Sequence, residues 1–113
     1  MKKKEEKRDD IIICSLEGEI NINTSLELRK VFDKFINNNE KKIIIDFSCI
    51  NYIDSSGLAT LIEMLQKLKK IGGNLYLVNL SDRIKNIFEV TKLIKLFSIF
   101  DNKDLAIESL KKI

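Results

Sequence analysis

The segment at residues 42–47 constrains the fold of this chain more than any other. It reads Lys-Ile-Ile-Ile-Asp-Phe and lacks the alternation of apolar and polar residues that marks a strand with one face in water. Such a strand is covered on both faces, so we expect it in the centre of a sheet flanked by helices. Strand-like and helix-like patterns alternate along the rest of the chain, which favours an α/β fold with helical crossovers.

The remaining elements are predicted from hydrophobic spacing. Short β-branched runs predict strands at residues 11–16, 74–79 and 96–100, and Gly18 breaks the first of these or forms a bulge in it. Apolar residues at helical spacing predict helices at residues 24–36, 55–70, 81–90 and 105–113, with a loop at residues 48–53. Residues 1–10 are almost all charged, and they fit either a frayed tail or a solvated edge strand ahead of one domain at residues 11–113.

The composition argues against several function classes. The chain has no histidine, and its two cysteines, Cys14 and Cys49, form no CxxC pair, so we expect no metal site. Both cysteines lie in apolar runs, which predicts two buried, reduced thiols in a cytoplasmic protein. The net charge of +3 is spread along the chain, which argues against direct binding of nucleic acid. No apolar run reaches the ~20 residues of a membrane span, and no apolar leader follows the first lysines.

A carboxylate and two hydroxyl groups lie close together at residues 54–57, which read Asp-Ser-Ser-Gly between the apolar strand and an amphipathic helix. Asp54, Ser55 or Ser56 would cap the free amide groups at the start of that helix, and Gly57 would allow a tight turn or a close approach. The same helix start would hold a phosphoryl group well, because its dipole favours negative charge. A phosphate adds about −1.5 to −2 charge, and beside Asp54 it would meet like charge and repel a partner. A plain helix cap and a phosphorylation site both fit these residues.

Catalytic motifs are missing from the sequence. A serine hydrolase needs G-x-S-x-G and a histidine base, and this turn has neither. There is also no phosphate-binding loop and no dinucleotide-binding loop. We therefore expect a protein that is not an enzyme and that has no catalytic residue and no cofactor.

The sequence resembles the STAS domain family, specifically bacterial anti-sigma factor antagonists. The resemblance rests on Tyr-Ile-Asp-Ser-Ser-Gly-Leu-Ala at residues 52–59, and it extends from about residue 11 to the C-terminus. Leu-Glu-Gly-Glu-Ile-Asn at residues 16–21 and the apolar strand at residues 43–47 are similar to further family segments, and so is Lys-Lys-Ile-Gly-Gly-Asn-Leu at residues 69–75. The resemblance implies one STAS-like α/β domain, with a mixed sheet of four to five strands and about four helices mainly on one side.

The resemblance also implies a role as a partner switch. In that role the unphosphorylated protein binds an anti-sigma factor that is also a serine kinase, and the binding frees a sigma factor. The kinase phosphorylates the first serine after the aspartate, here Ser55, which switches binding off, and a PP2C-type phosphatase reverses the modification. The residues implied in contacts with the partner are Asp54, Ser56, Gly57, Leu58, Asn21, Ile22 and Asn23.

Two features leave alternatives open. The family often has aspartate where this chain has Asn21, a difference that removes a charge from the loop near the serine. Apolar residues such as Ile20, Ile22 and Leu58 fit either the core or the partner face. An alternative function is a non-switching STAS scaffold subunit, in a stress-signalling assembly or in a lipid-transport ATPase complex.

Overall fold

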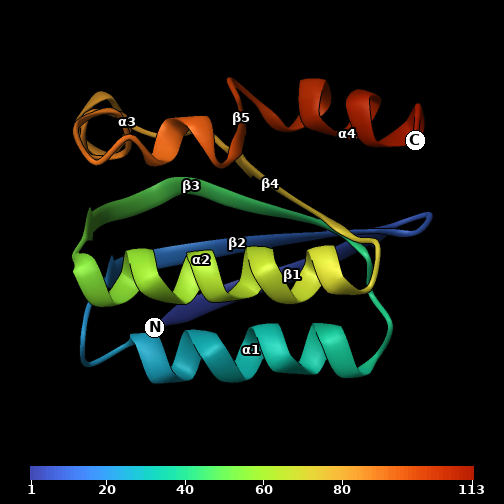
Figure 1. Cartoon of the computed structure of the whole chain (residues 1–113), viewed down its shortest axis with the longest axis horizontal. Coiled ribbons are helices and arrows are strands. Elements are labelled where there is room, and N and C mark those ends of the chain that lie inside the picture. The colour runs from blue at the N-terminus through green and yellow to red at the C-terminus, as the bar shows by residue number, and fades with distance from the viewer.

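Five strands form one sheet in the order β1-β2-β3-β4-β5, and the computed structural model describes residues 1–113 (Figure 1). The strands are β1 (Lys2–Arg8), β2 (Ile11–Ile20), β3 (Lys42–Ile53), β4 (Asn74–Val78) and β5 (Ser98–Phe100). The helices are α1 (Ser25–Asn37), α2 (Ser55–Lys70), α3 (Asp82–Val90), α4 (Lys103–Lys111) and the short 3₁₀ helix η1 (Leu93–Lys95). None of the helices combines the length and the apolar character needed to cross a bilayer.

β3 lies in the middle of the sheet, as its apolar sequence predicts. β2 and β4 pair with it in parallel on either side, β5 pairs in parallel with β4, and β1 pairs antiparallel with β2. Parallel neighbours need a crossover connection, and a helix supplies it after each of β2, β3 and β4. The predicted mixed sheet of four to five strands is confirmed, with five strands present.

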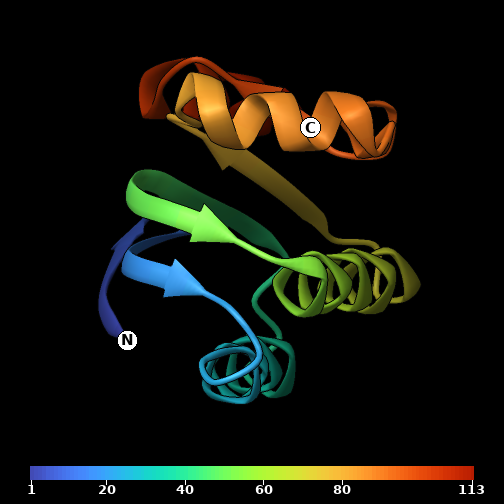
Figure 2. The same ribbon diagram turned by 90° about the vertical axis from the view of Figure 1, so that its left-hand side faces the viewer.

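The two faces of the sheet carry cores of unequal size. The larger core has 22 buried residues and joins β2, β3 and β4 to α1, α2 and α3. The smaller core has 8 buried residues, in which Ile11, Ile13 and Ile44 of the sheet pack against Ile107 and Leu110 of α4. Three of the four helices therefore cover one face, as predicted, and α1 and α2 lie side by side there (Figure 2).

The charged N-terminal residues form the edge strand β1. All seven of its residues are exposed, yet each pairs with β2, from Lys2 opposite Glu17 to Arg8 opposite Ile11. Charged side chains on an edge strand hinder pairing with another sheet, so the composition of β1 suits its position. Of the two alternatives for residues 1–10, the structure therefore shows the edge strand.

One prediction for the segment before Asp54 is wrong. Residues 48–53 are not a loop, because β3 continues through them and pairs with the second half of β2, with Cys49 opposite Glu17 and Ile53 opposite Ile20. The register between β2 and β3 shifts between Ser15 and Glu17 and again between Gly18 and Glu19. The bulge predicted near Gly18 is therefore present.

The two cysteines differ in environment. Cys14 is fully buried in the larger core, and its desolvation raises the pKa of the thiol to about 12. Cys49 was predicted to be buried as well, but it is exposed. It lies on a part of β3 where polar residues of β1 and β2, rather than a helix, are the neighbours.

We predict that Phe88→Ala destabilises the fold by about 3–5 kcal/mol. Phe88 is fully buried, and its ring centroid lies 6.5 Å from that of Phe47 and 5.6 Å from that of Phe97. Its removal therefore leaves a cavity between β3, α3 and the segment that joins η1 to β5. Urea unfolding followed by circular dichroism measures the change. Val90→Ala on the same helix is the matched control, since Val90 is 73% exposed, and it should change stability by less than ~0.5 kcal/mol. Equal effects of the two substitutions would contradict the assigned packing.

Candidate functional site

The candidate site lies at the end of the molecule where β2 and β3 finish and α1 and α2 begin (Figures 1 and 2). β3 ends at Ile53, Asp54 follows, and α2 begins at Ser55. β2 ends at Ile20, and residues 21–24 lead into α1. Because β2 and β3 are parallel neighbours, their pairing of Ile20 with Ile53 places the two connections beside each other.

Asp54 joins the two connections through both of its carboxylate oxygens. It has extended backbone angles and is the N-cap of α2, with Oδ1 accepting a hydrogen bond from the Gly57 amide at 3.0 Å. Oδ2 accepts one from the Ile22 amide at 3.2 Å, across 32 residues of sequence. The Asp54 amide in turn donates to the Ile20 carbonyl at 3.0 Å. The predicted helix cap is therefore present, and it also fixes the loop before α1.

Asn21 organises that loop from within. Its Oδ1 accepts hydrogen bonds from the amides of Asn23 at 2.9 Å and Thr24 at 3.2 Å, which is the geometry of an Asx turn. Its Nδ2 donates to the Glu19 carboxylate at 3.2 Å. An aspartate at this position would keep the two acceptor bonds but would face Glu19 with like charge. The amide of Asn21 is therefore matched to its local surroundings in this chain.

Ser55 is the more accessible of the two serines. It is exposed, it is the first residue of α2, and its hydroxyl makes no hydrogen bond within the protein. Ser56 is half-buried, and its carbonyl accepts a hydrogen bond from the Thr60 hydroxyl at 3.0 Å. The backbone amides of Ser55 and Ser56 have no acceptor in the protein, so they leave donors and the positive end of the helix dipole at this surface.

Gly57 is required by packing. A Cβ atom at this position would lie 2.6 Å from Ile20 Cγ2 and 2.8 Å from the Ile20 carbonyl oxygen. It would also lie 2.8 Å from Ile53 Cγ1. The first turn of α2 therefore presses directly on the last residues of β2 and β3, and the absence of a side chain at residue 57 allows this approach.

The apolar candidates divide into core and surface residues. Ile20 is fully buried and Leu58 is 9% exposed, so most of both side chains belongs to the core. Ile22 is 73% exposed, next to exposed Asn23 and half-buried Asn21. Sequence reasoning missed Leu26, which is 56% exposed one turn after Ile22. The exposure of Leu26 could have been predicted from the sequence, because helical spacing places Leu26 on the opposite side of α1 from the buried residues Leu28 and Phe32.

Residues that could hold a metal do not gather anywhere in the structure, since no group of three or more histidine, cysteine or acidic side chains is close enough to act as ligands. The polar atoms at the site are instead backbone amides, hydroxyls, side-chain amides and carboxylates. This set is suited to contacts with another protein and to carrying a phosphoryl group on a hydroxyl.

Comparisons with known proteins agree on one family. The model of the STAS domain family matches residues 2–106. A relative from Thermotoga neapolitana, named as a candidate anti-sigma factor antagonist, is 30% identical over 91% of this chain and 92% of its own. The crystal structure of a candidate antagonist from Thermotoga maritima superposes with a TM-score of 0.92 at 27% identity, over 96% of this chain and 94% of that one.

A third comparison concerns the fold alone. The anti-sigma factor antagonist SpoIIAA in its unphosphorylated form superposes with a TM-score of 0.77 at 20% identity, over 99% of this chain and 100% of that one. The phosphorylated form of SpoIIAA from Bacillus superposes with a TM-score of 0.75, over 96% of this chain and 99% of that one. The fold of this chain is thus similar to both states of SpoIIAA.

We predict that Gly57→Ala destabilises the protein by about 1–3 kcal/mol, because its methyl group overlaps the backbone and side chain of Ile20. Thermal and urea unfolding measure the loss. Ser55→Ala is the control in the same turn, since the Ser55 side chain is exposed and makes no hydrogen bond within the protein, and it should change stability by less than ~0.5 kcal/mol. A Gly57→Ala variant as stable as the parent would show that α2 can move away from β2.

Proposed function

The chain belongs to the STAS domain family, and from this premise we propose that it is an anti-sigma factor antagonist controlled by phosphorylation of Ser55. The proposal depends on one observation above all. Ser55 presents an exposed, unpaired hydroxyl at the first residue of α2, directly after the aspartate that caps the helix. The antagonists among its relatives and the two forms of SpoIIAA support this assignment.

The unphosphorylated protein binds its partner through the surface around Ser55. Ile22 supplies exposed apolar area, while Asn21, Asn23 and Ser56 supply polar groups around it. Asp54 acts mainly as a positioning residue, because its carboxylate holds the Ile22 and Gly57 amides. Gly57 and the mostly buried Leu58 support the surface from below. The partner is an anti-sigma factor with serine kinase activity, and its capture frees a sigma factor in the cytoplasm.

Phosphorylation changes the charge of this surface. The Ser55 hydroxyl oxygen attacks the γ-phosphorus of ATP held by the kinase, loses its proton, and ADP leaves. The phosphoserine carries about −1.5 to −2 charge. The free amides at the start of α2 stabilise that charge locally, so the fold is kept. The adjacent Asp54 carboxylate adds like charge, and together the two groups repel a partner that bound the neutral surface. A PP2C-type phosphatase restores the hydroxyl.

In this role the protein is a substrate of both enzymes and has no catalytic residue of its own. It requires no cofactor, and it controls transcription without contacting DNA directly. The scaffold alternative gives Ser55 no modification, so phosphorylation separates the two functions.

We predict that the cognate anti-sigma factor kinase and ATP place one phosphate on Ser55. Mass spectrometry of the intact protein and of its peptides measures the extent and the position of labelling. Ser55→Ala should abolish labelling, and Ser56→Ala is the control that should keep most of it, because the Ser56 hydroxyl is not the acceptor. Label on Ser56 alone, or no label with an active kinase, would rule out Ser55 as the switch. Recovery of transporter subunits in place of the kinase would favour the scaffold function.

We predict that Ile22→Ala weakens binding of the unphosphorylated protein to its anti-sigma factor by about tenfold, because the exposed Ile22 side chain becomes buried at the interface. Ser55→Asp should weaken binding in the same assay through its charge. Surface plasmon resonance with immobilised anti-sigma factor measures both. Ile113→Ala is the control, since Ile113 is 66% exposed but lies at the opposite end of the molecule (Figure 1). Equal affinity of the parent and Ile22→Ala would place the interface elsewhere.

A further inference from the structure

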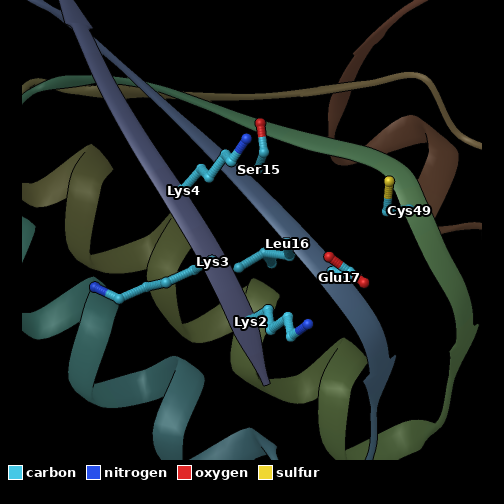
Figure 3. Close-up of a pocket in the computed structure, with 7 residues that line it drawn as sticks. All are labelled: Lys2, Lys3, Lys4, Ser15, Leu16, Glu17 and Cys49. Atoms are coloured by element: carbon cyan, nitrogen blue, oxygen red, sulfur yellow. The ribbon is translucent and has the colours of Figure 1, made fainter.

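A groove of about 390 Å³ lies beside the part of the sheet that α4 leaves uncovered. α4 covers Ile11 and Ile13 of β2, but the strand continues beyond α4 to Ser15 and Glu17. β1 forms one side of the groove and β3 contributes Cys49 (Figure 3). The residues that line it are Lys2, Lys3, Lys4, Ser15, Leu16, Glu17 and Cys49. None of them belongs to the site around Ser55.

The groove carries positive charge that the protein does not neutralise. Lys3 points away from Ser15 and Cys49 and pairs with Glu5 at 2.6 Å (Figure 3). Lys2 and Lys4 make no salt bridge, and they project from the same face of β1 about 7 Å apart along the strand. The register places Lys4 opposite Ser15 and Lys2 opposite Glu17. Two ammonium groups and a hydroxyl therefore face the groove near a single carboxylate.

We propose that this groove binds a small phosphate monoester whose organic part carries hydroxyl groups. A phosphate dianion matches the charge of Lys2 and Lys4, and its oxygens accept hydrogen bonds from both ammonium groups and from the Ser15 hydroxyl. Lysine binds phosphate as a point charge, whereas planar two-point recognition of a carboxylate is the property of arginine. The nearest arginine of β1, Arg8, is paired with Glu6 outside the groove. The donors therefore favour phosphate over carboxylate.

The rest of the groove determines the organic part of the ligand. The groove has a volume of about 390 Å³, whereas a water molecule occupies only ~30 Å³ of liquid. A phosphate group is a few times larger than a water molecule, so most of the groove remains for the organic part of the ligand. Leu16 is 1% exposed and belongs to the larger core, so its side chain adds almost no apolar surface to the groove. Cys49 contributes an exposed thiol and Glu17 adds a carboxylate. That carboxylate repels the phosphate but accepts hydrogen bonds from hydroxyl groups, so it orients the ligand with its phosphate towards Lys4 and its hydroxyls towards Glu17. A sugar phosphate has this combination of groups.

Titration of the full chain with glucose 6-phosphate, followed by amide shifts in ¹H–¹⁵N NMR spectra, tests the proposal. We expect saturable shifts at Lys4, Ser15 and Cys49, weaker binding of inorganic phosphate, and no binding of glucose. Lys4→Gln should weaken the binding of glucose 6-phosphate by about tenfold, because it removes a charged hydrogen bond. Lys69→Gln is the control, since Lys69 is an exposed lysine of α2 outside the groove.

Four results would overturn the proposal. The first is the absence of shifts at millimolar glucose 6-phosphate, which would leave the lysines with the edge-protecting role of β1 alone. The second is equal affinity of the parent and Lys4→Gln. The third is a set of shifts confined to residues 55–57, which would assign phosphate binding to the start of α2. Inorganic phosphate binding as tightly as the ester would remove the role of the organic part. The assay contains no kinase and no ATP, so its result is independent of Ser55 phosphorylation.

Discussion

The carboxylate of Asp54 is the constraint on which the functional end of the molecule depends. One oxygen holds the first turn of α2 and the other holds the loop before α1, so a single side chain sets both edges of the surface around Ser55. Gly57 completes the arrangement, because the missing side chain lets α2 rest directly on Ile20 and Ile53. A charged group at residue 55 therefore sits on a rigid support. Its addition alters the electrostatic character of the surface more readily than its shape.

Much of the fold follows from local sequence patterns. The unbroken apolar run at residues 43–45 predicts the central strand, and the spacing of Leu58, Leu61, Leu65 and Leu68 predicts α2. Local patterns failed where a distant strand decides the outcome. Residues 48–53 extend β3 because the second half of β2 pairs with them, and Cys49 is exposed because no helix covers that position. Neither fact is encoded in the segment itself.

The candidate site was only partly accessible from the sequence. The cap at Asp54 follows from its residue type before an amphipathic helix, and Gly57 signalled a tight turn or a close approach. Residue chemistry alone left Ser55 and Ser56 as equals, and the family resemblance favoured Ser55. Ile22 could be separated from Ile20 and Leu58 only after folding, since burial in the assembled sheet distinguishes them. The hydrogen bond from the Ile22 amide to Asp54 joins residues 32 positions apart, so no local sequence pattern predicts it.

The unequal cores imply that different parts of the domain open at different rates. The 22-residue core holds α1, α2 and α3, whereas α4 rests on a core of only 8 residues, a Tyr76–Ser109 hydrogen bond and a Lys103–Asp46 ion pair. In native-state hydrogen exchange, the amides of α4 would therefore exchange through a local opening that leaves the rest of the sheet closed. The amides of β3 and α2 would exchange only when the whole domain unfolds. The switch surface is thus built on the side of the sheet with the larger core, and α4 rests on the side with the smaller one.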